Sequence, residues 1–250
     1  MADPIVNYPD NTIFGQRIRD HHDDKVSVAQ RAVDMFMADG SSAFIGDGSS
    51  TLYVGLELFE RKRQAIVWTN HLAIAHEFAL WSAIHELPNM ELYLAEGEVD
   101  YKLMMTYGQK AEDFVRDHSR RAPNIFLSVR CILCDQGPSG FEQNSLQIKQ
   151  AAVRSRQNII FLTDYTKLSQ PTTLSLPLVY SPSTKWQTIL ENDNVFIITT
   201  SHPDAKTPMN YVQKPNNEVD WYCYHAHKLA TTMNTRGKKR FIEIPPKCIQ

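Results

Sequence analysis

Apolar residues recur along most of the chain at spacings that alternate between helical and extended periods. In residues 25–39 the apolar positions share one helical face, and Gly40 follows as a residue that ends the helix. Short runs of β-branched and aromatic residues separate this pattern from further helical ones. Helices are predicted over 25–39, 51–63, 71–87, 108–117, 145–156 and about 218–235, and strands over 42–46, 64–69, 90–95, 124–134, 158–163, 195–200 and 240–244.

The order of these segments predicts the fold class. Strands and helices alternate from residue 25 to residue 163, which is typical of an α/β fold with a mostly parallel central sheet, helices on both faces and a Rossmann-like arrangement. Residues 99–107 are predicted to be extended, and residues 169–185 and the polar loop 201–217 to be irregular. We expect a polar N-terminal lead-in over 1–24 and a single domain over 25–250 that is less regular from about residue 169 onward.

Composition narrows the class of protein. Hydrophobic residues make up 42% and charged residues 22% of the 250 residues, enough for a buried core, and a net charge of −2 does not favour general nucleic-acid binding. The chain has no apolar run long enough to span a membrane, and its N-terminus lacks the apolar region of a signal peptide. These features predict a cytoplasmic protein with reduced thiols and no membrane association.

Cysteine and histidine pairs raise the question of a metal or redox site. Cys131 and Cys134 form a C-x-x-C pair, but they lie in an apolar run that is predicted to be a buried strand, where residues three apart point to opposite faces. No second C-x-x-C follows at zinc spacing. Residues 21–24, His-His-Asp-Asp, are interpreted as solvated charge, and His225 and His227 do not face each other on a helix. We expect no metal and no cofactor.

The most informative motif joins a predicted strand to a predicted helix and reads Gly46-Asp47-Gly48-Ser49-Ser50-Thr51. Its glycines permit a tight turn and close approach of a ligand, and the N–H groups and dipole of a helix N-terminus favour an anion. The loop follows the carboxyl end of a strand, where open α/β sheets bind ligands. It lacks the G-K-[ST] ending of a P-loop and the last glycine of G-x-G-x-x-G. The alternative interpretation is a capped turn without a ligand.

Charged side chains after other strands extend this candidate site. Lys167, beside Asp164 just past a strand end, suits a phosphate or a sugar oxygen, the alternative being a solvated lysine. Asp47 and Glu96 both follow strands and suit ligand hydroxyls or acid and base chemistry, although either is equally compatible with a turn.

Three further candidates have strong structural alternatives. Lys149 lies in the middle of a predicted helix; it is a candidate ligand contact, but the pattern favours a surface residue. Thr69 and Asn70, at the end of a strand, are candidate ligand contacts or caps for the helix that starts near His71.

Four motifs in order give the chain a family resemblance. They are the loop 46–50, Thr69-Asn70, Glu96-Gly97 and Asp164-Tyr165-Thr166-Lys167. Over about residues 25–170 the chain resembles the C-terminal sensor domain of the DeoR family of transcription regulators. The family patterns at these places read D-S-G-T-T, T-N, G-G and D-x-[ST]-K, so the first and third are altered here.

The resemblance implies a fold shared with ribose phosphate isomerase, glucosamine phosphate deaminase and CoA transferases, and a phosphosugar effector in the crevice around these loops. The family carries a winged helix-turn-helix before the sensor, whereas residues 1–24 contain no recognition helix. We therefore expect no direct DNA binding by this chain, a homo-oligomer, and any regulatory output through a separate partner.

Two functions remain open at this point besides a purely structural subunit. The favoured one is a stand-alone sensor that binds a phosphorylated sugar or a related phosphate ester. The alternative is an aldose-ketose phosphate isomerase on the same fold, with Asp47, Glu96, Asp164 and Lys167 supplying a base and a cation. The D-G-A-D segment of the isomerases is absent at the corresponding stretch, which reads Cys134-Asp135-Gln136-Gly137.

Overall fold

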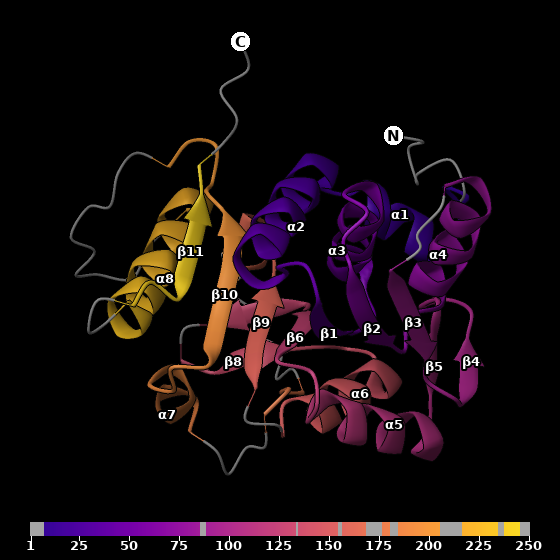
Figure 1. The fold of residues 1–250 in the computed structure, drawn as a ribbon. Coiled ribbons are helices and arrows are strands. Elements are labelled where there is room, and N and C mark those ends of the chain that lie inside the picture. Colours follow the sequence, from indigo (N-terminus) through magenta and orange to yellow (C-terminus); the bar gives the residue numbers. More distant parts are fainter. Residues whose placement is uncertain are drawn as a thin grey trace.

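The computed structural model describes residues 8–85, 89–133, 135–154, 157–168, 177–180, 185–205, 217–234 and 238–245. Its centre is a seven-stranded sheet with the order β11-β10-β9-β6-β1-β2-β3, in which every neighbouring pair is parallel (Figure 1). The strands are β1 (Ser41–Ile45), β2 (Ala65–Thr69), β3 (Met90–Leu94), β6 (Asn124–Ser128), β9 (Asn158–Leu162), β10 (Val195–Thr200) and β11 (Phe241–Ile244). The prediction of an α/β fold with a mostly parallel sheet is confirmed.

Helices pack on both faces of this sheet and bury it from two sides. On one face lie α1 (Ile13–Arg19), α2 (His22–Phe36), α3 (Ser49–Glu60) and α4 (Leu72–Ile84). On the other lie α5 (Gln109–Ser119), α6 (Gln143–Ala152), α7 (Trp186–Leu190) and α8 (Glu218–Met233). Successive residues of β6 belong to opposite cores, Ile125 and Leu127 to one and Phe126 to the other. Burial on both faces explains why the strands read as continuous apolar runs rather than as alternating ones.

The strand order creates a switch point beside β1. From β1 the chain proceeds outward to β2 and β3, then crosses back to β6 on the other side of β1, and continues to β9 and β10. The connections that leave β1 and β6 therefore diverge to opposite faces. Ligands of open α/β sheets bind at such a place, outside the carboxyl ends of the strands.

The segment predicted as a polar lead-in contains a helix and joins the core, so that prediction is wrong. Thr12 caps α1 by accepting a hydrogen bond on Oγ1 from Gly15 N–H at 3.0 Å, and Phe14 and Ile18 are fully buried. Helix α2 begins at His22, whose Nδ1 lies 2.8 Å from Tyr53 Oη, so residues 21–24 are not merely solvated charge. A helix of seven residues offers only two apolar contacts, too few for periodicity to reveal it.

Two predicted strands are interrupted. The run 124–134 divides into β6 and β7 (Cys131–Leu133), which forms a hairpin with β8 (Gly137–Ser139), and 99–107 becomes the hairpin of β4 (Glu98–Asp100) and β5 (Met105–Tyr107). Cys131 is buried, and Cys134 lies outside the described residues. Beyond residue 169, β10, α8 and β11 match the predicted elements within two residues, and most of the polar loop 201–217 lies outside the described residues. Within the described part of the chain, no helix has the length and apolar character needed to cross a membrane.

Candidate functional site

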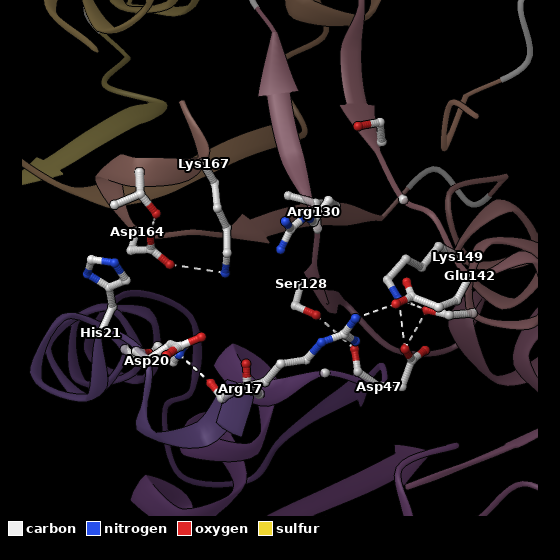
Figure 2. Close-up of a pocket in the computed structure, with 18 of the residues that line it drawn as sticks. Arg17, Asp20, His21, Asp47, Ser128, Arg130, Glu142, Lys149, Asp164 and Lys167 are labelled. Atoms are coloured by element: carbon white, nitrogen blue, oxygen red, sulfur yellow. Dashed lines mark hydrogen bonds and ion pairs between the residues drawn. The ribbon is translucent and has the colours of Figure 1, made fainter. Parts of the chain in front are cut away.

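A pocket of about 500 Å³ lies at the switch point, against the carboxyl ends of three adjacent strands (Figure 2). Asp47 and Gly48 follow β1, Ser128 and Arg130 lie at the end of β6, and the segment 164–167 follows β9. Helices α1 and α6 supply the remaining walls. Parallel pairing brings these loops together although the first and the last of them, at Asp47 and Lys167, are 120 residues apart in sequence.

The loop after β1 fits against β6 through its two glycines. A Cβ on Gly46 would lie 2.9 Å from Leu127 Cδ2, and a Cβ on Gly48 would lie 1.8 Å from Ser128 Oγ. Gly48 also has a φ of 125°, which side-chain-bearing residues rarely adopt. Ser128 Oγ donates to the carbonyl oxygen of Asp47 at 2.9 Å and locks the turn in place. The N-terminus of α3 therefore faces the pocket, with Gly48 and Ser49 in its lining.

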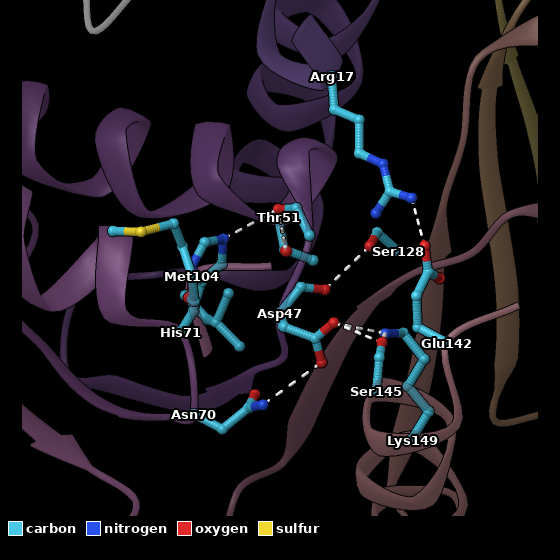
Figure 3. Close-up of polar contacts among 12 residues, drawn as sticks. Arg17, Asp47, Thr51, Asn70, His71, Met104, Ser128, Glu142, Ser145 and Lys149 are labelled. Atoms are coloured by element: carbon cyan, nitrogen blue, oxygen red, sulfur yellow. Dashed lines mark hydrogen bonds and ion pairs between the residues drawn. The ribbon is translucent and has the colours of Figure 1, made fainter. Parts of the chain in front are cut away.

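Asp47 is held in a buried ion pair with Lys149 (Figure 3). Lys149 Nζ lies 2.8 Å and Ser145 Oγ 2.5 Å from Asp47 Oδ2, while Asn70 Nδ2 donates to Asp47 Oδ1 at 3.3 Å. Burial by itself raises the pKa of the Asp47 carboxyl, but the charge and hydrogen bond of Lys149 and the Ser145 hydrogen bond together lower that pKa below its usual value. The carboxylate is therefore ionised and fully engaged with its neighbours.

The expectation that Lys149 is a surface residue is wrong. Its side chain is 7% exposed, because α6 packs against the pocket floor with Ser145 and Lys149 one turn apart and both directed at Asp47. An isolated lysine in a helix looks solvent-facing in sequence. Only the position of Asp47, 102 residues earlier, gives it a buried partner.

Five predicted ligand contacts are absent from the pocket lining: Gly46, Ser50, Thr51, Thr69 and Asn70. Thr69 Oγ1 donates to Ile45 O at 2.6 Å, and Thr51 Oγ1 donates to Gly48 O at 2.8 Å. Asn70 Nδ2 reaches Thr106 O at 3.3 Å as well as Asp47. The Thr51, Thr69 and Asn70 side chains therefore hold the loop in shape, and Ser50 Oγ is buried without a hydrogen-bond partner among the described residues.

His71, which the sequence did not single out, completes this support (Figure 3). Burial lowers the pKa of its imidazole to about 4, so the ring is neutral near pH 7. Nδ1 lies 3.3 Å from Ala73 N–H as the N-cap of α4 and 3.1 Å from Met104 O, and Nε2 lies 3.1 Å from Gly48 O, so the ring sits between two backbone carbonyls. The Gly48 carbonyl is therefore fixed from behind, and its amide side faces the pocket.

Asp164 and Lys167 form a second ion pair on the opposite wall. Lys167 Nζ lies 3.0 Å from Asp164 Oδ2, and Thr166 Oγ1 donates to the same carboxylate. Burial raises the pKa of Asp164, but the Lys167 charge and these hydrogen bonds outweigh it and lower the pKa to about 2. The sequence prediction that these two residues lie together at a strand end is met in the structure.

Helix α1 brings charges that the sequence prediction missed. Arg17 pairs with Glu142 across the pocket, and Lys25 donates to Arg17 O at 2.5 Å and to Asp20 O, the carbonyls at the end of α1. Burial and the nearby Lys167 charge lower the pKa of Lys25 to about 8. Neither Arg17 on α1 nor Lys25 on α2 belongs to a recognisable motif, so only the position of these helices reveals them.

Arg130 differs from Arg17, Lys149 and Lys167, the pocket cations that pair with carboxylates. Its guanidinium carbon lies 5.3 Å from the centroid of the Phe141 ring, and no carboxylate among the described residues pairs with it. Figure 2 shows the Arg130 and Lys167 side chains pointing into the hollow above Ser128, with Arg17 reaching toward it from the other side. The pocket therefore presents an unbalanced positive charge at this point, a suitable place for an anion.

Glu96 lies outside this arrangement. It is exposed on the surface, where its carboxylate is 3.4 Å from Lys110 Nζ, and it does not line the pocket. Its place after β3 puts it three strands away from β6, with β1 and β2 between them. Among the described residues, no cluster of three or more His, Cys, Asp or Glu side chains is arranged to hold a metal ion.

A comparison with protein families identifies the type of domain. The family described as the DeoR C terminal sensor domain matches residues 20–179. No curated protein sequence matches the chain.

Among solved structures, translation initiation factor eIF-2B of Pyrococcus horikoshii OT3 is 14% identical, with a TM-score of 0.42 over 60% of this chain and 49% of that one. Ribose 5-phosphate isomerase from Plasmodium falciparum is 14% identical, with a TM-score of 0.38 over 57% of this chain and 51% of that one. Ribose 5-phosphate isomerase A from Methanocaldococcus jannaschii is 15% identical, with a TM-score of 0.37 over 59% and 54%. The chain spans about half the length of these structures.

The glycine at position 48 yields a stability prediction. Gly48→Ala is expected to lower the free energy of unfolding by about 2–4 kcal/mol, because the new Cβ combines a strained φ with a clash against Ser128. Gly40→Ala is the matched control: Gly40 has a φ of 80°, but nothing lies within 4 Å of its Cβ position. Urea unfolding of both variants separates backbone strain from the clash, and equal losses would contradict the close packing described for the loop.

The buried Asp47–Lys149 ion pair leads to a second stability prediction. Lys149→Met is expected to cost about 3–5 kcal/mol because it leaves a buried carboxylate without its cation, whereas Asp47→Asn with Lys149→Met should cost clearly less than the sum of the single changes. Lys110→Met, which removes an exposed cation from Glu96, should change stability by less than about 0.5 kcal/mol. The test is a double-mutant cycle by denaturant unfolding; strictly additive losses would show that the pair is not coupled.

Proposed function

Because the chain belongs to the DeoR C-terminal sensor domain family, we propose that it is a sensor that binds a phosphorylated sugar, or a related small phosphate ester, in the pocket at the switch point. The observation that carries the proposal is Arg130, a cation aimed into the hollow with no carboxylate partner among the described residues. Gly48 and Ser49 at the N-terminus of α3 line the same pocket, which supports a phosphate there, because helix N-termini and arginine both bind such anions.

The remaining lining supports a small polar ligand. The pocket volume of about 500 Å³ lies within the range typical of small-molecule sites. Lys167 and Arg17 add positive charge beside Arg130, although each also has a carboxylate partner. Asp164 and Glu142 present ionised oxygens that suit the hydroxyl groups of a sugar, since a carboxylate accepts hydrogen bonds. This arrangement fits a ligand whose phosphate lies beside the cations and whose hydroxyl groups lie beside the carboxylates.

The carboxylates favour binding over isomerisation. A general base works best when its pKa is near the operating pH. Burial raises the pKa values of Asp47, Asp164 and Glu142, but their cationic partners outweigh it and lower all three. Glu96, the remaining candidate base, is outside the pocket. None of these described carboxylates therefore combines a place in the pocket with a pKa raised toward neutral pH, which disfavours the isomerase alternative.

Calorimetric titration with pentose and hexose phosphates tests the proposal. Arg130→Ala is expected to weaken binding of the best ligand by about 10- to 100-fold, the worth of a charge-assisted hydrogen bond. Arg116→Ala removes an arginine that pairs with Asp113 outside the pocket and should leave the affinity unchanged. If Arg130→Ala binds with wild-type affinity, the phosphate does not contact Arg130 and the proposal is contradicted at this point. Isomerase turnover in the wild type that is lost in Asp164→Asn would contradict the sensor proposal and favour the isomerase alternative.

Lys25 predicts how binding depends on pH. Its pKa is lowered to about 8, so in the free protein it carries its charge below that pH and loses it above. A phosphate ester is already a dianion above about pH 7, because its second pKa is about 6. The affinity should therefore fall as the pH rises through 8 in the wild type. It should stay nearly constant in Lys25→Arg, whose side chain does not titrate in this range. The same decline in both proteins would assign the effect to another group.

A further inference from the structure

The far edge of the sheet combines an unpaired strand with an unusually apolar helix. Strand β3 is the last strand of the sheet among the described residues, and α4 packs against it (Figure 1). Helix α4 has the sequence LAIAHEFALWSAI, apolar on every side, yet only Ala73, Ile74 and Glu77 are buried. A helix that is apolar all round is normally covered on all sides. Here Leu80 is 39% exposed and Ile84 is 74% exposed.

The hydrogen bonds between β2 and β3 show which backbone groups face outward. Ala65 N–H donates to Asn89 O at 3.2 Å, and Ala95 N–H donates to Thr69 O at 2.7 Å. Odd-numbered residues of this segment therefore direct their backbone groups toward β2. Since direction alternates along a strand, three residues direct theirs outward: Met90, Leu92 and Leu94. Within the described strand Met90–Leu94 there is no proline or lysine to prevent pairing with another strand.

The sequence of β3, Met90-Glu91-Leu92-Tyr93-Leu94, is self-complementary when reversed about Leu92. An antiparallel second copy places Leu92 opposite its own equivalent and Met90 opposite Leu94 of that copy, each pair exchanging two backbone hydrogen bonds. Glu91 then lies opposite Tyr93 of the second copy, a carboxylate facing a phenol donor. Tyr93 Oη already donates to Glu91 Oε2 at 2.6 Å within its own strand, so the two groups are on the same face.

We propose that β3 and α4 form a two-fold interface through which two copies of this chain join their sheets into one continuous sheet. The two-fold axis at Leu92 runs perpendicular to the sheet and keeps equivalent faces on the same side. The exposed side of α4 therefore meets its equivalent and covers Leu80 and Ile84. A strand pair of five residues alone is small against the roughly 800 Å² per partner of a stable interface, so the helix contact is required. A self-complementary patch of this kind closes as a dimer.

Sedimentation of the full chain tests the interface. The wild type is expected to be a dimer, and Leu80→Glu and Ile84→Glu should each raise its dissociation constant by about tenfold or more, since each places two like charges across the axis. Met35→Glu on α2 makes the same change at a residue that is 37% exposed away from this edge and should leave the dimer intact. A wild-type monomer at all concentrations, or a dimer that both α4 variants leave unchanged, would overturn the proposal.

Cysteine cross-linking tests the register. Leu92→Cys places two cysteines directly opposite each other at a Cα separation of about 5.5 Å, within disulfide reach, so mild oxidation should give a covalent dimer. Leu94→Cys is the control, because its equivalent in the second copy lies four residues along the strand, about 13 Å away. Cross-linking of Leu94→Cys but not Leu92→Cys would contradict the register, whatever the ligand bound in the pocket.

Discussion

The buried ion pair between Asp47 and Lys149 ties the loop after β1 to helix α6, and the architecture of the site depends on it. Removing two charges from water is costly, so such a pair persists only when further hydrogen bonds complete it, as Ser145 and Asn70 do here. With Asp47 committed in this way, the glycine turn keeps one shape and the N-terminus of α3 keeps one direction. In the proposed function the loop contributes its N–H groups, and the side chains that contact the ligand lie on the other walls of the pocket.

Those walls follow from the strand order. Because β1, β6 and β9 are parallel neighbours, their carboxyl ends bring Gly48, Arg130 and Lys167 around one hollow. Helix α1 closes the pocket from the side with Arg17, and Lys25 in turn holds the end of α1 through its carbonyls. A change in the charge of the pocket therefore acts directly on α1. The charges of the site and the position of α1 are linked through Arg17 and Lys25.

Sequence reasoning predicted the elements that depend on local pattern. The apolar strands, the Gly46–Gly48 turn and the Asp164–Lys167 pair are visible because each is contiguous in the chain. Sequence reasoning missed residues whose contact partners are distant in the sequence. Lys149 looks solvent-facing until Asp47 is placed beside it, and Arg130 lies within an apolar run that conceals the break between β6 and β7. Arg17 belongs to a helix too short to give a periodic signal.

We propose above all that the pocket at the switch point binds the phosphate of a small ester. A crystal structure of the chain with the sugar phosphate that binds best in titration tests it most directly. We expect the phosphate to lie within hydrogen-bond distance of the Arg130 guanidinium and of the N–H groups at the start of α3, and the sugar to be directed toward Asp164. A phosphate bound elsewhere while this pocket stays empty under saturating ligand would contradict it.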